Sequence, residues 1–180
     1  NKQMSKKIIF EDRNNDWDIW KKNNSIERSI KRIQNKLPEM EASKQLSKIV
    51  KKIYKKKNSI LDFGCAAGHY YNSLKKIDKE INYCGFDVTK DYISYAKKHF
   101  KKEKNTNFDV QSLFSMSKKY NNKFDIVFCA NVLHHLPSID IPLKNLINAS
   151  KKYCIIRTLV SDNTHLARFY YDDSLNRKGE

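Results

Sequence analysis

The sequence predicts an α/β fold, with a mostly parallel β-sheet and helices on both faces, preceded by N-terminal helices. Beyond Asn58, short apolar runs alternate with segments of helical periodicity. Helices of this length between strands indicate right-handed crossovers, which join parallel strands and cover both faces of a sheet. The first apolar run also leads directly into a turn with Gly64 and Gly68 and then into a helix, an order typical of such sheets.

Residues 1–57 are predicted to form an N-terminal helical segment that packs on a core of residues 58–180 within one domain. A first helix begins at Ser25, which fits an N-cap, and its apolar residues keep helical spacing until Pro38 interrupts, namely Ile26, Ile30, Ile33 and Leu37. A second helix follows, with one apolar stripe made of Ala42, Leu46, Ile49, Val50 and Ile53. Its lysines point away from that stripe, which indicates a solvated face. Residues 1–24 show no clean period.

The core is predicted to contain five strands and three helices. The strands are the apolar runs SILDF, INYCGF, NFDV, FDIVFCA and YCIIRTLV, at residues 59–63, 81–86, 107–110, 124–130 and 153–160. The helices lie between them, at residues 68–77, 89–103 and about 138–150. Thr89 fits the N-cap of the middle helix.

Length and composition exclude several classes of protein. A chain of 180 residues suits one domain, which buries ~70% of its unfolded surface. Aromatic residues make up 12% of the chain, which excludes disorder over the whole length. No apolar run approaches the ~20 residues that cross a bilayer, and the first residues are too polar for a signal peptide. We therefore expect a cytoplasmic protein that is not inserted in a membrane.

The charge of the chain is strongly positive. Lys and Arg number 36 against 20 Asp and Glu, for a formal net charge of +16, of which residues 1–60 carry +10. Lys outnumbers Arg by 30 to 6, whereas nucleic-acid sites favour Arg for its fork of donors. We interpret the lysines mainly as a solvated surface, and we rank nucleic acid below a small molecule as the partner.

The four cysteines give no sign of a metal or disulfide framework. Each lies inside or at the end of an apolar run, at Cys65, Cys84, Cys129 and Cys154. No C-x-x-C pair occurs, and no His stands at zinc-finger spacing. Buried reduced thiols and no metal site are predicted.

The glycine turn narrows the choice of ligand. Two of only four glycines lie in SILDFGCAAGHYY, directly after the first strand. A dinucleotide fingerprint that starts at Gly64 needs a small residue at position 69, which is His69, and no GK[ST] follows for a phosphate-binding loop. The remaining pattern is D-x-G-x-A-x-G, from Asp62 to Gly68.

That pattern resembles motif I of the class I S-adenosylmethionine-dependent methyltransferases, D-x-G-x-G-x-G, with Ala66 in place of the second glycine. Asp87, 25 residues after Asp62, stands where the family has its ribose-binding acid. The run FDIVFCANVLHHLP, residues 124–137, looks like the fourth strand and the loop over the methionine moiety. The resemblance covers roughly residues 40–160 and implies a Rossmann-like fold, S-adenosylmethionine as cofactor and methyl transfer as the activity.

The resemblance also implies roles for individual residues. Asp62 and Gly64 are expected against the methionine part of the cofactor, with the carboxylate near the ammonium group directly or through water. Asp87 is expected to bind the ribose. Gln111 or Ser112 is expected to contact the adenine. The full set implied to bind the cofactor is Asp62, Gly64, Ala66, Gly68, Asp87, Val88, Gln111, Ser112 and Asn131.

The loop after the fourth strand bears on the class of methyl acceptor. The fourth strand is followed by Asn131-Val132-Leu133-His134 instead of the Asn/Asp-Pro-Pro-aromatic motif common in enzymes that methylate amines of nucleic acids. A small acceptor with an oxygen nucleophile is favoured, such as a metabolite, a sugar or a surface-glycan precursor. It can be phosphorylated or nucleotide-linked, with the anion bound by Arg28, Arg32 and Arg157.

A general base is needed only for a neutral hydroxyl acceptor, and the candidates are His134 and His135; structural hydrogen bonding is the competing interpretation of both. Two other functions stay open at this point. One is an RNA methyltransferase that docks through the basic helices of residues 25–57, and the other is a catalytically silent binding module. The family sheet has seven strands, whereas about 20 residues follow the fifth here, so the last hairpin is expected to be missing or to lie beyond Glu180. Oligomeric state and metal dependence are not decided.

Overall fold

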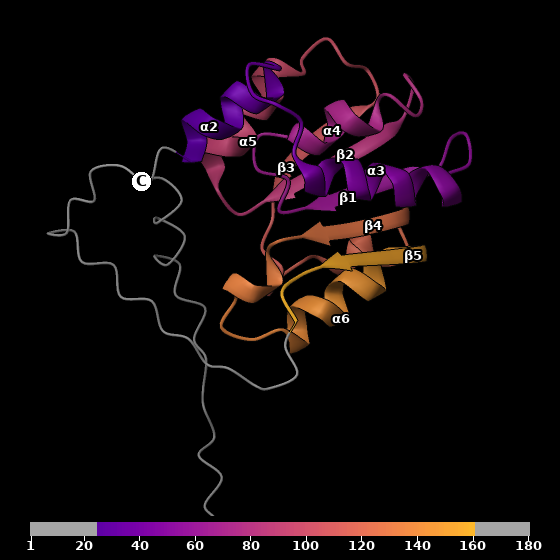
Figure 1. The fold of residues 1–180 in the computed structure, drawn as a ribbon. Helices are drawn as coiled ribbons and strands as arrows, with labels where there is room; N and C mark the ends of the chain where they lie inside the picture. Colours follow the sequence, from indigo (N-terminus) through magenta and orange to yellow (C-terminus); the bar gives the residue numbers. More distant parts are fainter. Residues whose placement is uncertain (1–24, 161–180) are drawn as a thin grey trace, which may run out of the picture.

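The structure, a computed structural model, describes residues 25–160 and contains one sheet of five parallel strands (Figure 1). In chain order these are β1 Ser59–Phe63, β2 Asn82–Asp87, β3 Thr106–Val110, β4 Phe124–Ala130 and β5 Ser150–Arg157. Their order across the sheet is β3-β2-β1-β4-β5, and every pairing is parallel. The predicted fold class is confirmed. From β1 the strands are added outward to β3 on one side, and β4 and β5 are added on the other side, so the strand order reverses between β1 and β4.

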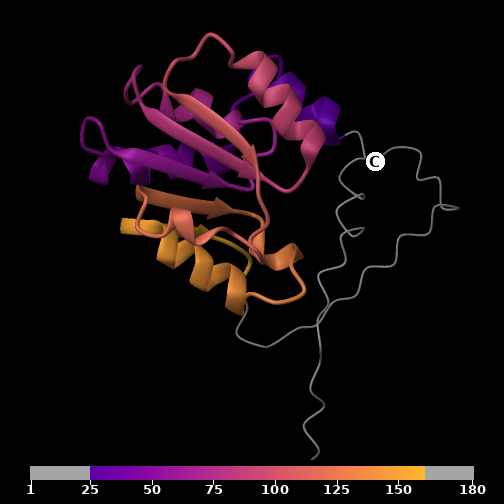
Figure 2. The ribbon, with the colours of Figure 1, turned by 180° about the vertical axis from the view of Figure 1, so that it is seen from behind.

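Five α-helices and two short 3-10 helices accompany the sheet in the described residues. They are α2 Ser25–Ile33, α3 Glu41–Ile53, α4 His69–Leu74, α5 Lys90–His99, η2 Lys118–Tyr120, η3 Leu133–His135 and α6 Asp140–Ala149. Helices α2 to α5 pack on one face and α6 on the other (Figures 1 and 2). The predicted helices therefore all occur, although α4 and α5 end three and four residues earlier than the periodicity predicts.

The buried strands explain the apolar runs of the sequence. In β1, Ile60 belongs to the core cluster under α2 to α5, whereas Leu61 belongs to the cluster under α6, and both are fully buried. The same alternation holds for Ile126 and Val127 in β4. A strand covered on both faces needs apolar residues at every position, so these runs lack the polar alternation of a half-solvated strand.

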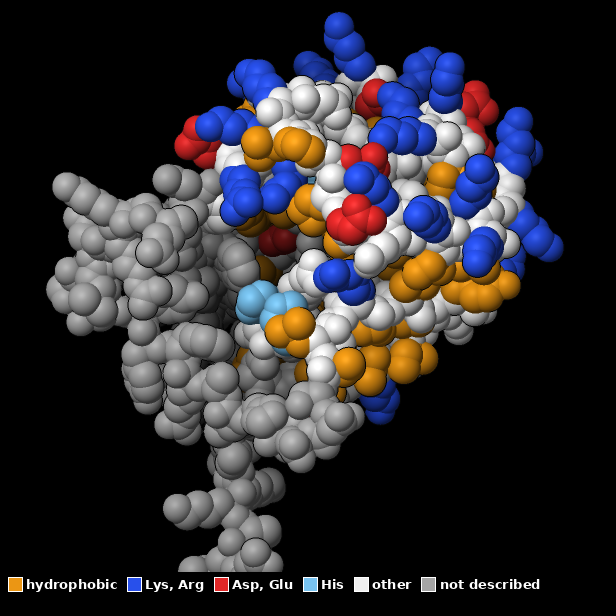
Figure 3. All heavy atoms as spheres, viewed as in Figure 1, with side chains coloured by type: hydrophobic (Ala, Val, Ile, Leu, Met, Phe, Trp, Pro, Cys, Tyr) orange, Lys and Arg blue, Asp and Glu red, His pale blue; other side chains and the backbone are white. Residues whose placement is uncertain are grey.

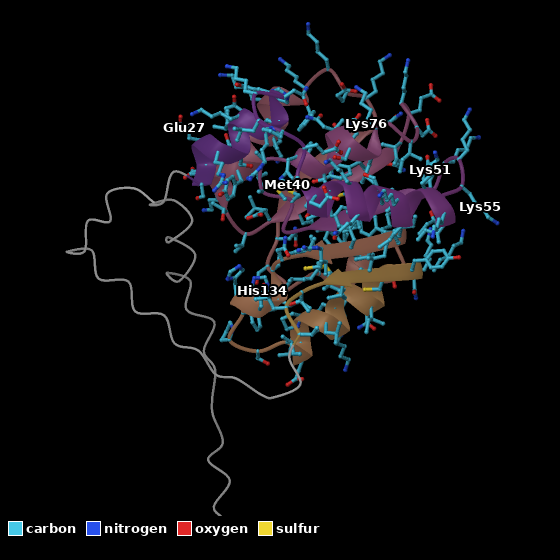
Figure 4. The ribbon with its side chains drawn as sticks, viewed as in Figure 1. Glu27, Met40, Lys51, Lys55, Lys76 and His134 are labelled. Atoms are coloured by element: carbon cyan, nitrogen blue, oxygen red, sulfur yellow. The ribbon has the colours of Figure 1, made fainter. Side chains whose placement is uncertain are left out.

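The two N-terminal helices are packed on the core. Leu46 and Val50 of α3 are buried, but Ile49, which the stripe of the second helix includes, is 46% exposed, so that part of the prediction is wrong. Ile49 stands one residue before Val50 and is turned by about 100° around the helix, away from the sheet. Lys51 of α3 and Lys55, just beyond its end, point outward, as predicted (Figure 4). Residues 1–24 and 161–180 of the predicted domains lie outside the described residues.

The four cysteines are free thiols. Cys65, Cys84 and Cys129 are buried and Cys154 is half-buried. The prediction of buried reduced thiols is thus confirmed for three of them, and Cys154 is more accessible because β5 is an edge strand. Among residues 25–160, no helix combines the length and apolar character that crossing a membrane requires.

One carboxylate ties the amino ends of three strands together. Asp125 of β4 accepts hydrogen bonds from the Ser59 backbone N–H at 2.9 Å and the Ser59 hydroxyl at 3.0 Å. Its other oxygen lies 3.1 Å from Nζ of Lys152 in β5. These hydrogen bonds, the backbone one first, lower the pKa of Asp125 to about 2.

Because this pKa lies below the ordinary value of about 3.9, ionised Asp125 stabilises the fold above about pH 4, and the contribution is lost as the pH falls toward 2. We expect Asp125→Asn to lower the free energy of unfolding at pH 7 by about 1 kcal/mol, since the lysine pair is partly exposed. Denaturant unfolding should show the difference shrinking between pH 4 and pH 2.5. Glu80→Gln, at an exposed loop position, is the control, and an equal loss for both variants would contradict the assignment.

Candidate functional site

A pocket with a volume of about 360 Å³ lies at the carboxyl ends of β1, β2 and β4. It is lined by the glycine turn after β1, the end of β2, residues 112–114, the loop after β4 and one side of α2. Figure 3 shows the hollow on this face, with basic side chains above it and histidine side chains below. In parallel α/β sheets, ligands bind at this edge, where the strand order reverses.

The turn after β1 is held tightly by backbone bonds. The N–H groups of Gly64 and Cys65 both donate to the carbonyl of Phe86, at 2.7 and 3.0 Å. Gly64 has a φ of 82°, and a Cβ there would lie 2.2 Å from Cγ2 of Val132. Glycine at this position therefore lets the loop after β4 close against the turn.

Asp87, at the end of β2, joins the turn to the next helix. Its Oδ2 accepts from the Ala66 N–H and its Oδ1 from the Thr89 N–H, both at 2.9 Å. Thr89 precedes α5 as predicted but makes no side-chain cap; its hydroxyl bonds to Asp87 instead. Burial raises the pKa of Asp87, while the backbone hydrogen bonds oppose that effect. A carboxylate can accept about four hydrogen bonds, so Asp87 suits a hydroxyl group of a ligand in addition to these partners.

Asp62 is fully buried in β1, behind the pocket wall. Its Oδ2 accepts a hydrogen bond of 2.5 Å from the hydroxyl of Tyr83, and its Oδ1 has no partner among residues 25–160. Burial raises the pKa of Asp62 well above its usual range, and the bond from Tyr83 acts in the opposite direction. A buried oxygen without a donor is costly, and an ammonium group or a water that bridges to one would satisfy it.

The remaining predicted cofactor residues divide into two groups. Gly64, Ala66, Val88, Ser112 and Asn131 line the pocket, together with Asp87. Gly68 ends the turn as the N-cap of α4, with a φ of 90°, and does not line the pocket. Gln111 is directed elsewhere, since its amide donates to Asp109 at 3.0 Å. Of the two adenine candidates, the geometry therefore favours Ser112.

The two histidines differ in position. His135 lines the pocket, whereas His134 does not. Nδ1 of His134 lies 3.5 Å from the hydroxyl of Thr158. Burial lowers the pKa of both, helped by Arg157 at His134 and by His134 at His135. Both imidazoles are therefore mainly neutral near pH 7, the form that can accept a proton. Within residues 25–160, no group of three or more His, Cys, Asp or Glu side chains could hold a metal ion.

Sequence reasoning missed one wall of the pocket. Helix α2 contributes Ser25 and Ser29 beside Arg28 and Arg32, and α4 contributes His69 and Tyr70. The two arginines were predicted as anion contacts, but Arg157, predicted with them, does not line the pocket and instead donates to Oδ1 of Asn131. The polar stripe of α2 was visible in its i, i+3, i+4, i+7 spacing, but only the docked helix shows what it faces.

The residues present fit an S-adenosylmethionine cofactor: a carboxylate suited to a ribose, an orphaned buried oxygen near the turn, and a glycine cradle. A family model described as a methyltransferase domain matches residues 54–177, which is more than half of the chain. The chain belongs to the class I S-adenosylmethionine-dependent methyltransferase family. The predicted family is confirmed, and its cofactor is the one that the sequence predicts.

Two curated relatives are each 31% identical to the chain over 110 or more residues. They are the mitochondrial ubiquinone biosynthesis O-methyltransferase of Saccharomyces cerevisiae and the tRNA U34 carboxymethyltransferase of Helicobacter pylori. Each match covers 58% of this chain but only 34% and 41% of the respective relative, so the chain spans well under half of their length.

Solved structures support the fold. An S-adenosylmethionine-dependent methyltransferase from Aquifex aeolicus aligns with a TM-score of 0.52 at 23% identity, over 65% of this chain and 72% of that one. The YcgJ protein from Bacillus subtilis aligns with a TM-score of 0.53 at 20% identity, over 61% and 46%. At these identities the likeness concerns the fold alone.

The departure from the family motif leads to a stability prediction. Ala66 has a φ of 49°, in the left-handed region, where a residue with a side chain costs about 1–2 kcal/mol. Glycine at this position removes the strain, but it also increases the conformational entropy of the unfolded chain, which offsets part of the gain in stability. We expect Ala66→Gly to raise the free energy of unfolding by about 0.5–1 kcal/mol, measured by thermal and denaturant unfolding.

The neighbouring Ala67 provides the matched control for this substitution. It is fully buried and is not among the residues with positive φ. Ala67→Gly should therefore lower the stability by about 1 kcal/mol, because it removes a buried methyl group and relieves no strain. A similar loss for Ala66→Gly would show that the turn is not strained at Ala66.

Proposed function

We propose that the chain is the cofactor-binding part of a methyltransferase that transfers the methyl group of S-adenosylmethionine to an oxygen nucleophile of a small molecule. The observation that carries the proposal is Asp87, held by the N–H groups of Ala66 and Thr89 at the rim of the pocket beside the glycine turn. The enclosure of the pocket by α2 supports a small acceptor. The similarity to an enzyme named as an O-methyltransferase supports the oxygen nucleophile.

The residues of the chain supply position more than chemistry. When bound, the cofactor provides an already activated methyl group on a sulfonium, so the protein mainly aligns the acceptor and excludes water. Asp87 and the turn would hold the nucleoside, and Asp62 would orient the amino end. Asn131 and Val132 would border the methionine chain. We place the protein in the cytoplasm, which the free thiols support.

The cofactor assignment can be tested with S-adenosylhomocysteine, the product of methyl transfer. At about 100 times its dissociation constant, the ligand should add ~2.7 kcal/mol and raise the melting temperature by roughly 5 to 11 °C. Asp87→Asn should weaken binding at least about 10-fold, since a charged acceptor is lost. Calorimetry and thermal shift measure both effects.

The matched control is Asp109→Asn. This carboxylate is at the end of the neighbouring strand β3 but does not line the pocket, so its loss should leave S-adenosylhomocysteine binding within 2-fold. NADH should give no shift. Equal binding by wild type and Asp87→Asn, or no binding by the wild type at millimolar ligand, would sink the proposal. Cofactor binding without turnover on any acceptor would instead favour a silent binding module.

We propose His135 as the general base for a neutral hydroxyl acceptor. It lines the pocket, and its lowered pKa leaves the imidazole able to accept a proton. With any hydroxyl acceptor found in a panel, His135→Ala should reduce kcat about 10²- to 10⁴-fold, while His134→Ala should reduce it less than 10-fold. Release of S-adenosylhomocysteine measures the rate, and equal losses in both variants would favour a structural role for the histidine pair.

A second candidate function is RNA methylation, which the similarity to a tRNA carboxymethyltransferase favours. The basic face of α3 is poorly placed for it. Lys51, in the last turn of α3, and Lys55, just after it, lie near the amino end of β1, whereas the pocket opens at the carboxyl end (Figure 4). The five residues of β1 separate the two ends by roughly 17 Å. Salt-dependent binding of tRNA that Lys51→Gln/Lys55→Gln weakens would support this candidate.

A further inference from the structure

The side of α2 that faces the pocket is polar. Ser25, Arg28, Ser29 and Arg32 all line the pocket, as their spacing along one helical face requires. The helix is held at this place by two bonds to the core. The Ala67 N–H in the glycine turn donates to the Ser29 hydroxyl at 3.2 Å, and the amide of Asn72 donates to the Ile33 carbonyl at 2.9 Å. The arginines are therefore presented by a docked helix.

The two guanidinium groups have no anionic partner in the described part of the chain. The acidic residue of α2, Glu27, pairs at 2.7 Å with Lys31 on the opposite side of the helix (Figure 4). Burial lowers the pKa of Arg32, and the neighbouring charge of Arg28 lowers it further. Like charges one helical turn apart repel each other, so the arginine pair destabilises the helix unless an anion lies between the two groups.

Two further polar groups of this wall are unsatisfied. Both ring nitrogens of His69 and the hydroxyl of Tyr70 are buried without a hydrogen-bond partner in residues 25–160, although both residues line the pocket. Burial and the charge of Arg32 lower the pKa of His69 to about 4, so the ring is neutral and offers one N–H donor. Unpaired buried donors of this kind indicate a ligand that carries acceptor atoms.

The charges of the site point to the acceptor. S-adenosylmethionine carries a sulfonium, an ammonium and one carboxylate, and is a monocation. Among residues 25–160, Asp87 is the one carboxylate that lines the pocket, with Asp62 buried behind it, against the two cationic side chains of Arg28 and Arg32. With the cofactor bound, the site keeps an excess of positive charge, and an acceptor with a carboxylate or phosphate group would neutralise it.

We propose that Arg28, Arg32 and His69 form a subsite for an anionic group of the acceptor, a carboxylate or a phosphate. The subsite rests on the proposed function, because it defines the class of acceptor for the same pocket. Each guanidinium group can donate two parallel N–H hydrogen bonds to either anion, and the neutral imidazole of His69 can donate one more. The acceptor is then a small anionic molecule whose charged end lies under α2 and whose nucleophile points to the glycine turn.

The test uses the full chain and the double variant Arg28→Gln/Arg32→Gln. The probes are inorganic phosphate, S-adenosylhomocysteine and 5′-methylthioadenosine, which lacks the amino acid end. Calorimetry in a phosphate-free buffer of low ionic strength should show phosphate binding to the wild type saturated with S-adenosylhomocysteine. The double variant should bind phosphate at least about 10-fold more weakly and both nucleosides within 2-fold of wild type.

Lys51→Gln/Lys55→Gln removes the same charge from the end of α3 and the turn after it, and should leave phosphate binding unchanged. If the control loses as much phosphate affinity as Arg28→Gln/Arg32→Gln, the effect comes from net charge alone and the proposed subsite is wrong. If Arg28→Gln/Arg32→Gln weakens S-adenosylhomocysteine but not 5′-methylthioadenosine, the arginines bind the carboxylate of the cofactor, and the proposal is wrong. If the wild type binds phosphate but neither nucleoside, the proposed function fails while the anion subsite stands.

Discussion

The carboxylate of Asp87 is the interaction on which the architecture of the site depends. It accepts the N–H of Ala66 in the turn after β1 and the N–H of Thr89 before α5, and so fixes the ends of two neighbouring strands relative to each other. The carboxylate itself is buried, and charge-assisted hydrogen bonds are strong in such a place. The pocket wall is therefore organised by a residue that is itself expected to bind the ligand. This double use explains why the predicted ribose-binding acid is also a structural element.

The glycine turn is the second point where structure and function meet. Its backbone receives support from three directions: the end of β2, the loop after β4 and helix α2. Because the Ala67 N–H donates to the Ser29 hydroxyl, the turn that we propose to hold the cofactor also positions helix α2 beside the pocket. In the proposed function, cofactor contacts and acceptor contacts are thus coupled through a few residues of backbone. An alanine in the left-handed conformation within this turn shows that the chain tolerates local strain to keep that geometry.

The positions of the basic side chains say more about function than the net charge of the chain does. The lysines of α3 lie on a solvated face, near the amino ends of the strands, whereas two arginines of α2 lie at the carboxyl edge beside the pocket. A net charge of +16 does not distinguish these two situations. The arginines differ because they have no ion-pair partner among the described residues and sit beside unsatisfied buried groups of α4. The proposed class of acceptor therefore rests on these two arginines and not on the overall positive charge.

The sequence by itself determined the α/β class, the strands β1 and β4 to the residue, and the spacing of Asp62, Gly64 and Asp87 that defines the family. These features are local, since burial on both faces and a tight turn leave their mark on consecutive residues. Only the tertiary structure decided which side chains meet. It brought α2 against the turn, directed Gln111 away from the pocket and placed His135, but not the adjoining His134, in the pocket wall. Such contacts join residues far apart in the chain, and neither periodicity nor composition encodes the direction in which a loop or a docked helix presents its side chains.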